Sequence, residues 1–135
     1  EQGKIEKDMA SLVSLPALLK FIKTPLGLRM HRAACREKLY KEKPFVMGKS
    51  AREALEESNS DEIVLIQGII DVFFEEEDEI VLLDYKTDSV QNGKELSDRY
   101  RTQMELYQEA VERALGKRVK EKVLYSFCLG ESVIL

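Results

Sequence analysis

Residues 63–88 constrain the fold of this chain more than any other stretch. Two apolar runs, Ile63–Phe74 and Ile80–Tyr85, flank an acidic turn at Glu75–Glu79. Both runs are short and rich in Ile, Val, Leu and Phe, which favours strands over helices. Both faces of the first run are apolar, as in strands that are covered on each side. The stretch therefore predicts a β-hairpin at the centre of a sheet with helices on both faces.

The register of this hairpin brings two carboxylates together. With residues 77–78 at its tip, Asp71 lies directly opposite Asp84 on the same face of the sheet. Like charges so placed are destabilising, and two carboxylates in an apolar sheet are costly to bury. A divalent cation would remove both costs, because Mg²⁺ takes carboxylate oxygens together with water and substrate phosphate. Strand alternation adds Lys86 to this face, and an ammonium beside a metal suits phosphodiester chemistry.

A plainer interpretation of the same residues stays open. The two strand ends could be solvated and carry only a surface ion pair, and the pattern Asp-x-Lys is frequent by chance. Clusters of carboxylates mark functional sites in some proteins and structural ion pairs in others. The spacing alone therefore leaves a metal site and a solvated strand end as alternatives.

Length and composition fit one globular domain. At 135 residues the chain has room for one core, and its 44% hydrophobic and 34% charged residues are ordinary values. No apolar run approaches the ~20 residues that span a bilayer. Cys35 and Cys128 lack metal-binding spacing, so we expect reduced packing residues in a cytoplasmic protein. The net charge of −4 gives no basic footprint, so any attraction to DNA must come from a local patch, a cation or a partner.

Helices and edge strands are expected around the hairpin. Thr24 and Pro25 form a helix start, Pro44 restricts its segment to an edge strand or a strand with a bulge, and Gly116 ends the longest helix. The expected elements are, over 9–21, either two short helices or one that starts near Pro16, then a helix from Thr24, an edge or bulged strand over 38–47, a short helical or irregular insert over 50–58, a helix over 94–115, and strands over 119–127 and 133–135.

Four polar or aromatic residues in these elements are candidates for function. Glu42 lies in the edge strand, where a charged residue is normally solvated. His31, the only histidine, is interpreted as an ordinary, partly exposed helix residue despite the general usefulness of histidine near neutral pH. Gln103 lies on the apolar stripe of the long helix, four residues before Tyr107, so both side chains point the same way. A glutamine there must find polar partners.

The segments GIID, DYKTD and QMELY, in this order, resemble the RecB-like nuclease branch of the PD-(D/E)XK superfamily. The resemblance is closest to the C-terminal nuclease domain of AddA-type subunits of bacterial helicase–nucleases. TPLGLRMHRA, YKEKPF, LSDRYRTQMELYQEAVERALGKRVKE and LYSFCLGE are similar to consecutive pieces of that domain, so nearly the whole chain is covered. The resemblance implies an α/β, restriction-endonuclease-like fold with a mixed central sheet of about four or five strands flanked by helices.

The resemblance also implies a role for each motif residue. The metal ligands would be Asp71, Asp84 and the backbone carbonyl of Tyr85. The catalytic lysine would be Lys86, and a further metal-binding or supporting carboxylate would be Glu42. The Q-x-x-x-Y pair that lines the DNA strand would be Gln103 and Tyr107.

The implied activity is Mg²⁺-dependent hydrolysis of DNA phosphodiester bonds, with Mn²⁺ able to substitute, in double-strand-break repair and recombination. The partners would be DNA, ATP-binding helicase domains of the same polypeptide and a second, AddB-like subunit. Members of the family that this chain resembles usually carry a metal-binding histidine on a helix upstream of the first segment seen here. His31 does not match that histidine. We therefore expect a fragment that begins after that histidine, with reduced metal occupancy and activity. The alternative is a catalytically incomplete DNA-binding or interaction module on the same fold.

Overall fold

The computed structural model describes residues 14–55 and 59–135 and contains a five-stranded sheet in the order β1-β2-β3-β4-β5. Neighbouring strands are antiparallel except β3 and β4, which are parallel. The predicted mixed sheet with flanking helices is therefore confirmed. The elements are α2 (Leu15–Ile22), α3 (Pro25–Cys35), β1 (Leu39–Ser50), α4 (Ala51–Ala54), β2 (Ile63–Glu76), β3 (Glu79–Lys86), α5 (Gly93–Leu115), β4 (Val119–Ser126) and β5 (Glu131–Ile134).

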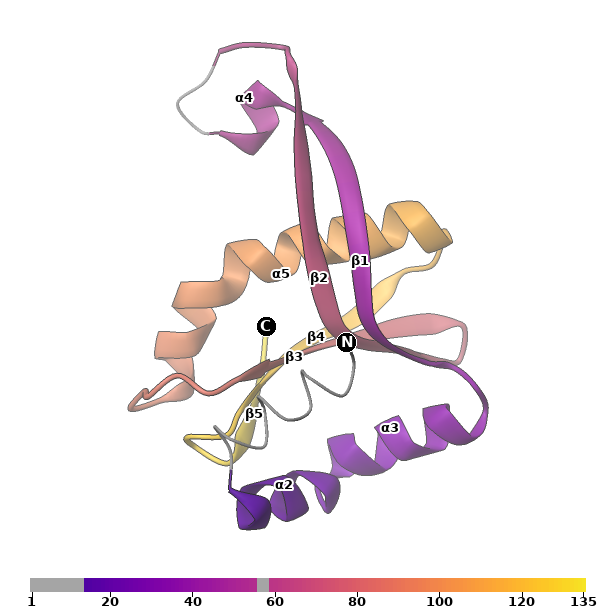
Figure 1. The fold of residues 1–135 in the computed structure, drawn as a ribbon, viewed down its shortest axis with the longest axis vertical. Coiled ribbons are helices and arrows are strands. Elements are labelled where there is room, and N and C mark those ends of the chain that lie inside the picture. Colours follow the sequence, from indigo (N-terminus) through magenta and orange to yellow (C-terminus); the bar gives the residue numbers. More distant parts are fainter. Residues whose placement is uncertain (1–13, 56–58) are drawn as a thin grey trace.

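The helices cover opposite faces of the sheet, with α2 and α3 on one side and α5 on the other (Figure 1). Each face has its own apolar core. The core under α2 and α3 contains Phe21, Leu26, Met30, Ala33, Val72, Phe74, Val81, Leu83, Val123 and Tyr125. The core under α5 contains Ile70, Phe73, Ile80, Leu82, Val90, Leu96, Met104, Val111, Val119 and Leu124. Strand β3 alternates between the two cores, as a strand covered on both faces should.

Local signals set the helix ends. The hydroxyl of Thr24 accepts a hydrogen bond from the Gly27 amide at 3.0 Å at the start of α3. The side chain of Asn92 accepts from the Glu95 amide at 3.0 Å at the start of α5. Gly116 ends α5 with a φ of 66°, a left-handed conformation that glycine adopts without steric cost. The predicted start at Thr24 and stop at Gly116 are therefore confirmed. The first part of the expected 9–21 segment lies outside the described residues.

Strands β1 and β2 are longer than predicted and change face at one position. Tyr40 and Phe45 both lie on the α5 side, although regular alternation would put them on opposite faces. The change occurs at Glu42, whose φ of 52° is left-handed. On β2 the same change occurs at Asp71, since Ile70 and Phe73 both join the α5 core. The register on either side places Glu42 opposite Asp71, so the irregularity crosses both strands.

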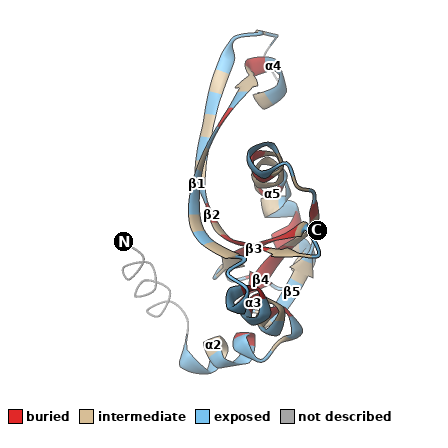
Figure 2. Ribbon diagram, turned by 90° about the vertical axis from the view of Figure 1, so that its right-hand side faces the viewer, coloured by how far each residue is buried: buried red, intermediate tan, exposed pale blue. Residues whose placement is uncertain are grey.

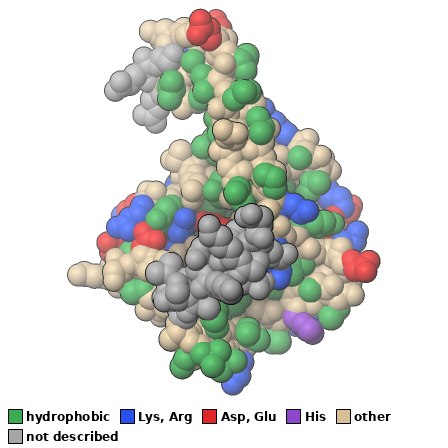
Figure 3. Space-filling view, in the orientation of Figure 1, with side chains coloured by type: hydrophobic (Ala, Val, Ile, Leu, Met, Phe, Trp, Pro, Cys, Tyr) green, Lys and Arg blue, Asp and Glu red, His purple; other side chains and the backbone are tan. Residues whose placement is uncertain are grey.

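Beyond this irregularity, β1 and β2 leave the body of the domain as a curved arm, 43–50 paired with 63–70 (Figures 1 and 2). The prediction that all of β2 is covered on both faces is wrong for the arm. Its outer face bears apolar side chains that stay exposed (Figure 3). They are Val46, Ile63, Leu65 and Ile69, with exposed fractions of 66%, 69%, 70% and 54%. Only the inner face of the arm meets α5.

Two further expectations concern the cysteines and membranes. Both Cys35 and Cys128 are free thiols, but they are exposed, so the expectation that they pack in the core is wrong. Cys35 is the last residue of α3 and Cys128 lies in the turn between β4 and β5, so both are at element ends and not on the faces that form the two cores. Within residues 14–55 and 59–135, no helix has the length and apolar character needed to cross a membrane.

Candidate functional site

Two aspartates from neighbouring strands meet on the α5 side of the sheet. The predicted register is confirmed for β2 and β3, with pairs from Glu76–Glu79 to Val72–Leu83. Continued by one position, this register sets Asp71 beside Asp84, and their carboxyl groups share a hydrogen bond. Asp84 is only 4% exposed. The structure therefore brings together the two carboxylates that the sequence pattern singled out.

The backbone of β3 holds Asp71 in place. The amide nitrogen of Tyr85 donates to Asp71 Oδ2 at 3.0 Å. In a regular ladder this amide would bond to the carbonyl of Ile70, so a side chain replaces a backbone acceptor where β2 bends away. A strand residue points its N–H and C=O to the same neighbour, so the Tyr85 carbonyl faces this gap too. Its ring turns to the opposite core, where it meets Phe21 edge-on at 5.5 Å between ring centroids.

Burial and mutual repulsion govern the ionisation of this pair. Burial raises the pKa of Asp71 to about 8, with the hydrogen bond and charge of Asp84 contributing to the rise. The Tyr85 amide and the Lys86 charge oppose this rise without cancelling it. The two carboxyl groups therefore resist carrying two negative charges at neutral pH, and a proton shared by the pair relieves this. A proton here does what a cation would do, which is to relieve the repulsion between two carboxylates.

The side chain of Lys86 is directed at the Asp71–Asp84 pair. Its ammonium lies 2.7 Å from Asp84 Oδ2 and donates to Gln103 Oε1 at 3.2 Å. Its side chain is 14% exposed, so the charge is largely withdrawn from water. Gln103 thereby finds the polar partner that its place on the apolar stripe requires.

Helix α5 forms the second wall of the site. Tyr107 packs edge-on against Phe45 with ring centroids 5.4 Å apart. Burial raises the pKa of Tyr107, and the charges of Asp84 and Asp71 add to the rise, so its hydroxyl lies within their electrostatic reach. A Cβ at Gly68 would come within 3.0 Å of the Phe45 ring and 3.6 Å of the Tyr107 ring. The glycine of GIID is thus what lets these two rings lie over β2.

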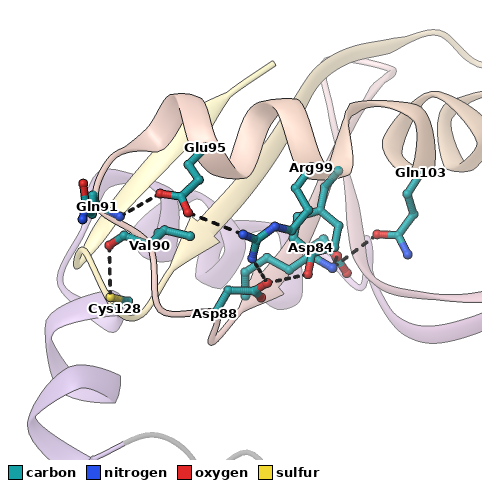
Figure 4. A network of polar contacts seen from close by, with 10 residues as sticks. Asp84, Asp88, Val90, Gln91, Glu95, Arg99, Gln103 and Cys128 are labelled. Carbon is teal, nitrogen blue, oxygen red and sulfur yellow. Dashed lines mark hydrogen bonds and ion pairs between the residues drawn. The ribbon is translucent and has the colours of Figure 1, made fainter.

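Sequence reasoning missed a second cluster next to Lys86. The ring of Tyr100 lies under the Lys86 ammonium, 3.7 Å from the ring centroid. The Tyr100 hydroxyl and Arg99 Nη1 each donate to Asp88 Oδ2 at 2.7 Å. Figure 4 shows Arg99 and Gln103 on α5 directed at the strand end that carries Asp84. One signal was available, because Tyr100 precedes Gln103 by three residues and shares its face of the helix.

Glu42 and His31 lie in different surroundings. Glu42 occupies the register position opposite Asp71, in its left-handed conformation. His31 is exposed on α3, on the far face of the sheet, and it contacts Cys35 one turn on, with Nε2 and Sγ 3.6 Å apart. Within the described part of the chain, no three His, Cys, Asp or Glu side chains are close enough to hold a metal ion. Neither residue therefore joins the two aspartates in this conformation.

The donor set still fits a hard divalent cation. Asp71 and Asp84 supply carboxylate oxygens, and the carbonyl of Tyr85 faces the same gap. Such a cation takes oxygen ligands and keeps several waters, so few protein ligands are required. The raised pKa of Asp71 reflects surroundings in which added positive charge is favourable. A cation there would lie between the two strands and next to Lys86.

Comparisons with known proteins agree with this geometry. The sequence profile of the PD-(D/E)XK nuclease superfamily matches residues 11–131. The chain is 41% identical over 135 residues to the A subunit of the ATP-dependent helicase/nuclease of Alkaliphilus oremlandii, covering 97% of this chain and 11% of that protein. It is 44% identical over 131 residues to the protein of the same name from Thermoanaerobacter sp. strain X514, covering 93% and 10%.

A third relative extends the pattern. The corresponding helicase/nuclease protein of Lachnoclostridium phytofermentans is 35% identical over 167 residues, covering 98% of this chain and 12% of that protein. The chain thus spans about a tenth of the length of the curated relatives it matches. With a superfamily match over most of its residues, this chain belongs to the PD-(D/E)XK nuclease superfamily.

Proposed function

We propose that this domain hydrolyses DNA phosphodiester bonds with the help of Mg²⁺, for which Mn²⁺ substitutes. Nucleases of this superfamily generally use divalent metal ions. The observation that carries the proposal is the Asp71–Asp84 pair on the α5 side of the sheet, where Asp84 is buried and where burial and the nearness of Asp84 raise the pKa of Asp71. Carboxyl groups with strongly shifted pKa values cluster at functional sites.

Each residue of the site has a proposed part in this reaction. Asp71, Asp84 and the Tyr85 carbonyl would hold the cation, which when bound supplies charge stabilisation and a more acidic water. Lys86 presents a fixed positive charge to the negative charge that develops on the scissile phosphate. Gln103 keeps the Lys86 ammonium in position through its carbonyl oxygen. Tyr107 lines the path of the DNA strand on α5.

The setting of the reaction follows from the relatives. They are named as A subunits of an ATP-dependent helicase/nuclease, and this chain matches about a tenth of each. We propose that the domain works as the nuclease arm of such a protein, in the cytoplasm, with ATP-driven helicase domains in the same polypeptide and a second, AddB-like subunit. Double-strand-break repair and recombination would then be its process.

Cation binding and DNA cleavage should be measured together on the folded domain. Calorimetric titration with Mn²⁺ and a cleavage assay on single- and double-stranded DNA should both give signals that Asp84→Asn removes. Asp98→Asn is the matched control, because Asp98 is exposed on α5 and pairs with Lys94, away from the site. Cleavage that persists in the presence of a chelator, or in Asp84→Asn, would contradict the proposal.

The second candidate is a DNA-binding or interaction module that keeps the fold without the catalysis. One observation favours it, namely that only two acidic side chains gather at the site within the described residues. Such a module would bind DNA, and Mn²⁺ weakly, without cutting. Cation binding together with DNA binding but no cleavage in the same two assays would select this candidate.

A further inference from the structure

We propose that Tyr100 is a positioning residue that holds the ammonium of Lys86 over its ring, and that Asp88 fixes Tyr100 for this purpose. The proposal rests on the proposed function, since it concerns how the lysine of a nuclease site is kept in place. Tyr100 lies outside the motif residues that the sequence pattern indicated. Its link to the site is purely spatial, through α5.

Three groups surround the Lys86 ammonium. Asp84 Oδ2 lies at 2.7 Å, Gln103 Oε1 at 3.2 Å, and the centroid of the Tyr100 ring at 3.7 Å. The first two are hydrogen-bond acceptors, and the third attracts the cation through the negative face of its π-system. Since the Lys86 side chain is 14% exposed, this attraction is weakly screened by water. The ring also closes one side of the space in which the flexible lysine could move.

The ring is the contact of Lys86 that does not depend on Asp84, and it would remain if Asp84 held a cation. Asp84 is also a proposed metal ligand, and a carboxylate that shares its charge with a cation attracts Lys86 less strongly. Gln103 is neutral and supplies a single acceptor oxygen. The Tyr100 ring acts on Lys86 independently of Asp84, so it can hold the ammonium when the carboxylate turns to another positive charge.

Asp88 fixes the orientation of the ring. The Tyr100 hydroxyl donates to Asp88 Oδ2 at 2.7 Å, and Arg99 donates to the same oxygen at 2.7 Å. The hydrogen bond from Tyr100 and the one from Arg99 lower the pKa of Asp88, so it stays ionised at neutral pH. A phenol that donates to an anion also becomes more electron-rich, which strengthens the attraction of its ring for a cation. The loop after β3 thereby connects Lys86 to α5.

The contact itself can be tested by NMR without any cleavage assay. Protons on the Lys86 side chain over the ring face should be shifted upfield by the ring current, and the resonance is assigned by its loss in Lys86→Arg. Tyr100→Phe should keep most of this shift, because the ring stays. Tyr100→Leu should remove it. An unshifted Lys86 resonance in the unmodified protein, or one unchanged in Tyr100→Leu, would overturn the proposal.

The consequence is tested by the kinetics of DNA cleavage with Mg²⁺. Tyr100→Leu should lower kcat about tenfold, which corresponds to about 1.4 kcal/mol in the barrier, with KM nearly unchanged. Tyr100→Phe should lower kcat by about threefold, because the ring stays but loses the bond to Asp88 that fixes it, and an unchanged kcat in this variant would show that Asp88 has no such role. Tyr40→Leu is the matched control. The Tyr40 hydroxyl also donates to a carboxylate, that of Glu75 at 3.1 Å, and its ring stacks on Phe73 and packs against the same core as Tyr100. A structural role would make both leucine variants behave alike.

The two proposals fail in different ways. If the unmodified domain cuts no DNA, the proposed function fails, and the Lys86 resonance alone decides whether Tyr100 holds the lysine. If the domain cuts DNA and Tyr100→Leu retains full kcat, the proposed function stands and the positioning role of Tyr100 is wrong.

Discussion

The amide of Tyr85 on β3 donates to Asp71 Oδ2 at 3.0 Å, so a side-chain carboxylate of β2 takes the place of the β2 backbone carbonyl that a regular ladder would offer. This single bond accounts for the shape of the site. The hydrogen bond joins β2 and β3 just beyond Val72–Leu83, the last pair of their backbone ladder. It leaves a gap between the two strands. The gap lies beside Asp84 and Lys86, the ion pair at the end of the hairpin.

Asp71→Asn tests whether the Asp71–Asp84 pair lowers the stability of the fold without a cation and whether it is needed for DNA cleavage. In the absence of metal the folded state must protonate Asp71, whose pKa is about 8, or bury a second negative charge. Asparagine removes this cost and still accepts from the Tyr85 amide. We expect the melting temperature at pH 8 in a chelator to stay level or rise, by up to about 5 °C. Cleavage should be abolished.

The direction in which Asp71→Asn changes the melting temperature distinguishes a functional Asp71–Asp84 pair from a structural one. If Asp71 and Asp84 were ordinary stabilising residues, Asp71→Asn would lower the melting temperature in a chelator. Adding Mn²⁺ should reverse the order of the two proteins, because only the unmodified protein gains stability from binding the cation. Calorimetric melting with and without Mn²⁺ measures both effects.

Much of this fold could be predicted because its signals are local. The acidic turn between two apolar runs determined the hairpin register, and Thr24 and Gly116 marked helix ends that the structure confirms. The Asp71–Asp84 pair follows from that register alone. Regular alternation failed at one point, Glu42, because a left-handed residue reverses the faces of a strand without leaving a mark in the hydrophobic pattern.

The part of the site that could not be predicted is tertiary. Tyr100 and Asp88 are joined across a loop and a helix, and the helical spacing that sets Tyr100 one turn before Gln103 does not by itself say that its ring reaches the lysine. The exposed outer face of the arm was also missed, because an apolar strand has the same sequence pattern whether or not another surface covers it.

Gly68→Ala tests the packing of rings over β2. The new Cβ would lie 3.0 Å from Phe45 Cε1, and the ring cannot move freely because it is packed against Tyr107. We expect a loss of about 1 kcal/mol in unfolding free energy and weaker DNA cleavage, because Tyr107 is displaced. Gly48→Ala is the control: its Cβ meets Ile63 Cγ2 at 3.2 Å, and Ile63 is exposed and can turn away. Equal effects of the two changes would contradict this account.

Gln103→Ala tests the acceptor on Lys86. Its carbonyl oxygen accepts from the ammonium at 3.2 Å, and alanine is the best helix former, so α5 should remain intact. We expect cleavage to fall several-fold while the melting temperature changes little. Gln108→Ala on the same helix is the control, since Gln108 contacts Glu112, one turn on along α5. If Gln103→Ala lowers the melting temperature and leaves turnover per folded molecule intact, Gln103 is a structural residue.

The attachment of α3 to the sheet should fail in acid. Arg29 Nη2 and Nε donate to Glu76 at 2.8 and 3.0 Å, and these bonds lower the pKa of Glu76 to about 2. A carboxyl with a folded-state pKa below its unfolded value of about 4.5 stabilises the fold above pH 4.5. That stability is lost progressively as the pH falls toward 2. Allowing for partial exposure, the contribution is about 1 kcal/mol.

Glu76→Gln isolates this contribution. The variant should be less stable than the unmodified protein at pH 7 by about 1 kcal/mol, and the two unfolding free energies should converge as the pH falls to about 2. Glu77→Gln at the exposed tip of the hairpin is the control and should change neither value. The measurement is urea unfolding from pH 7 to pH 2. A constant difference between Glu76→Gln and the unmodified protein over this range would show that Arg29 stabilises α3 through packing of its side chain rather than through the charge of Glu76.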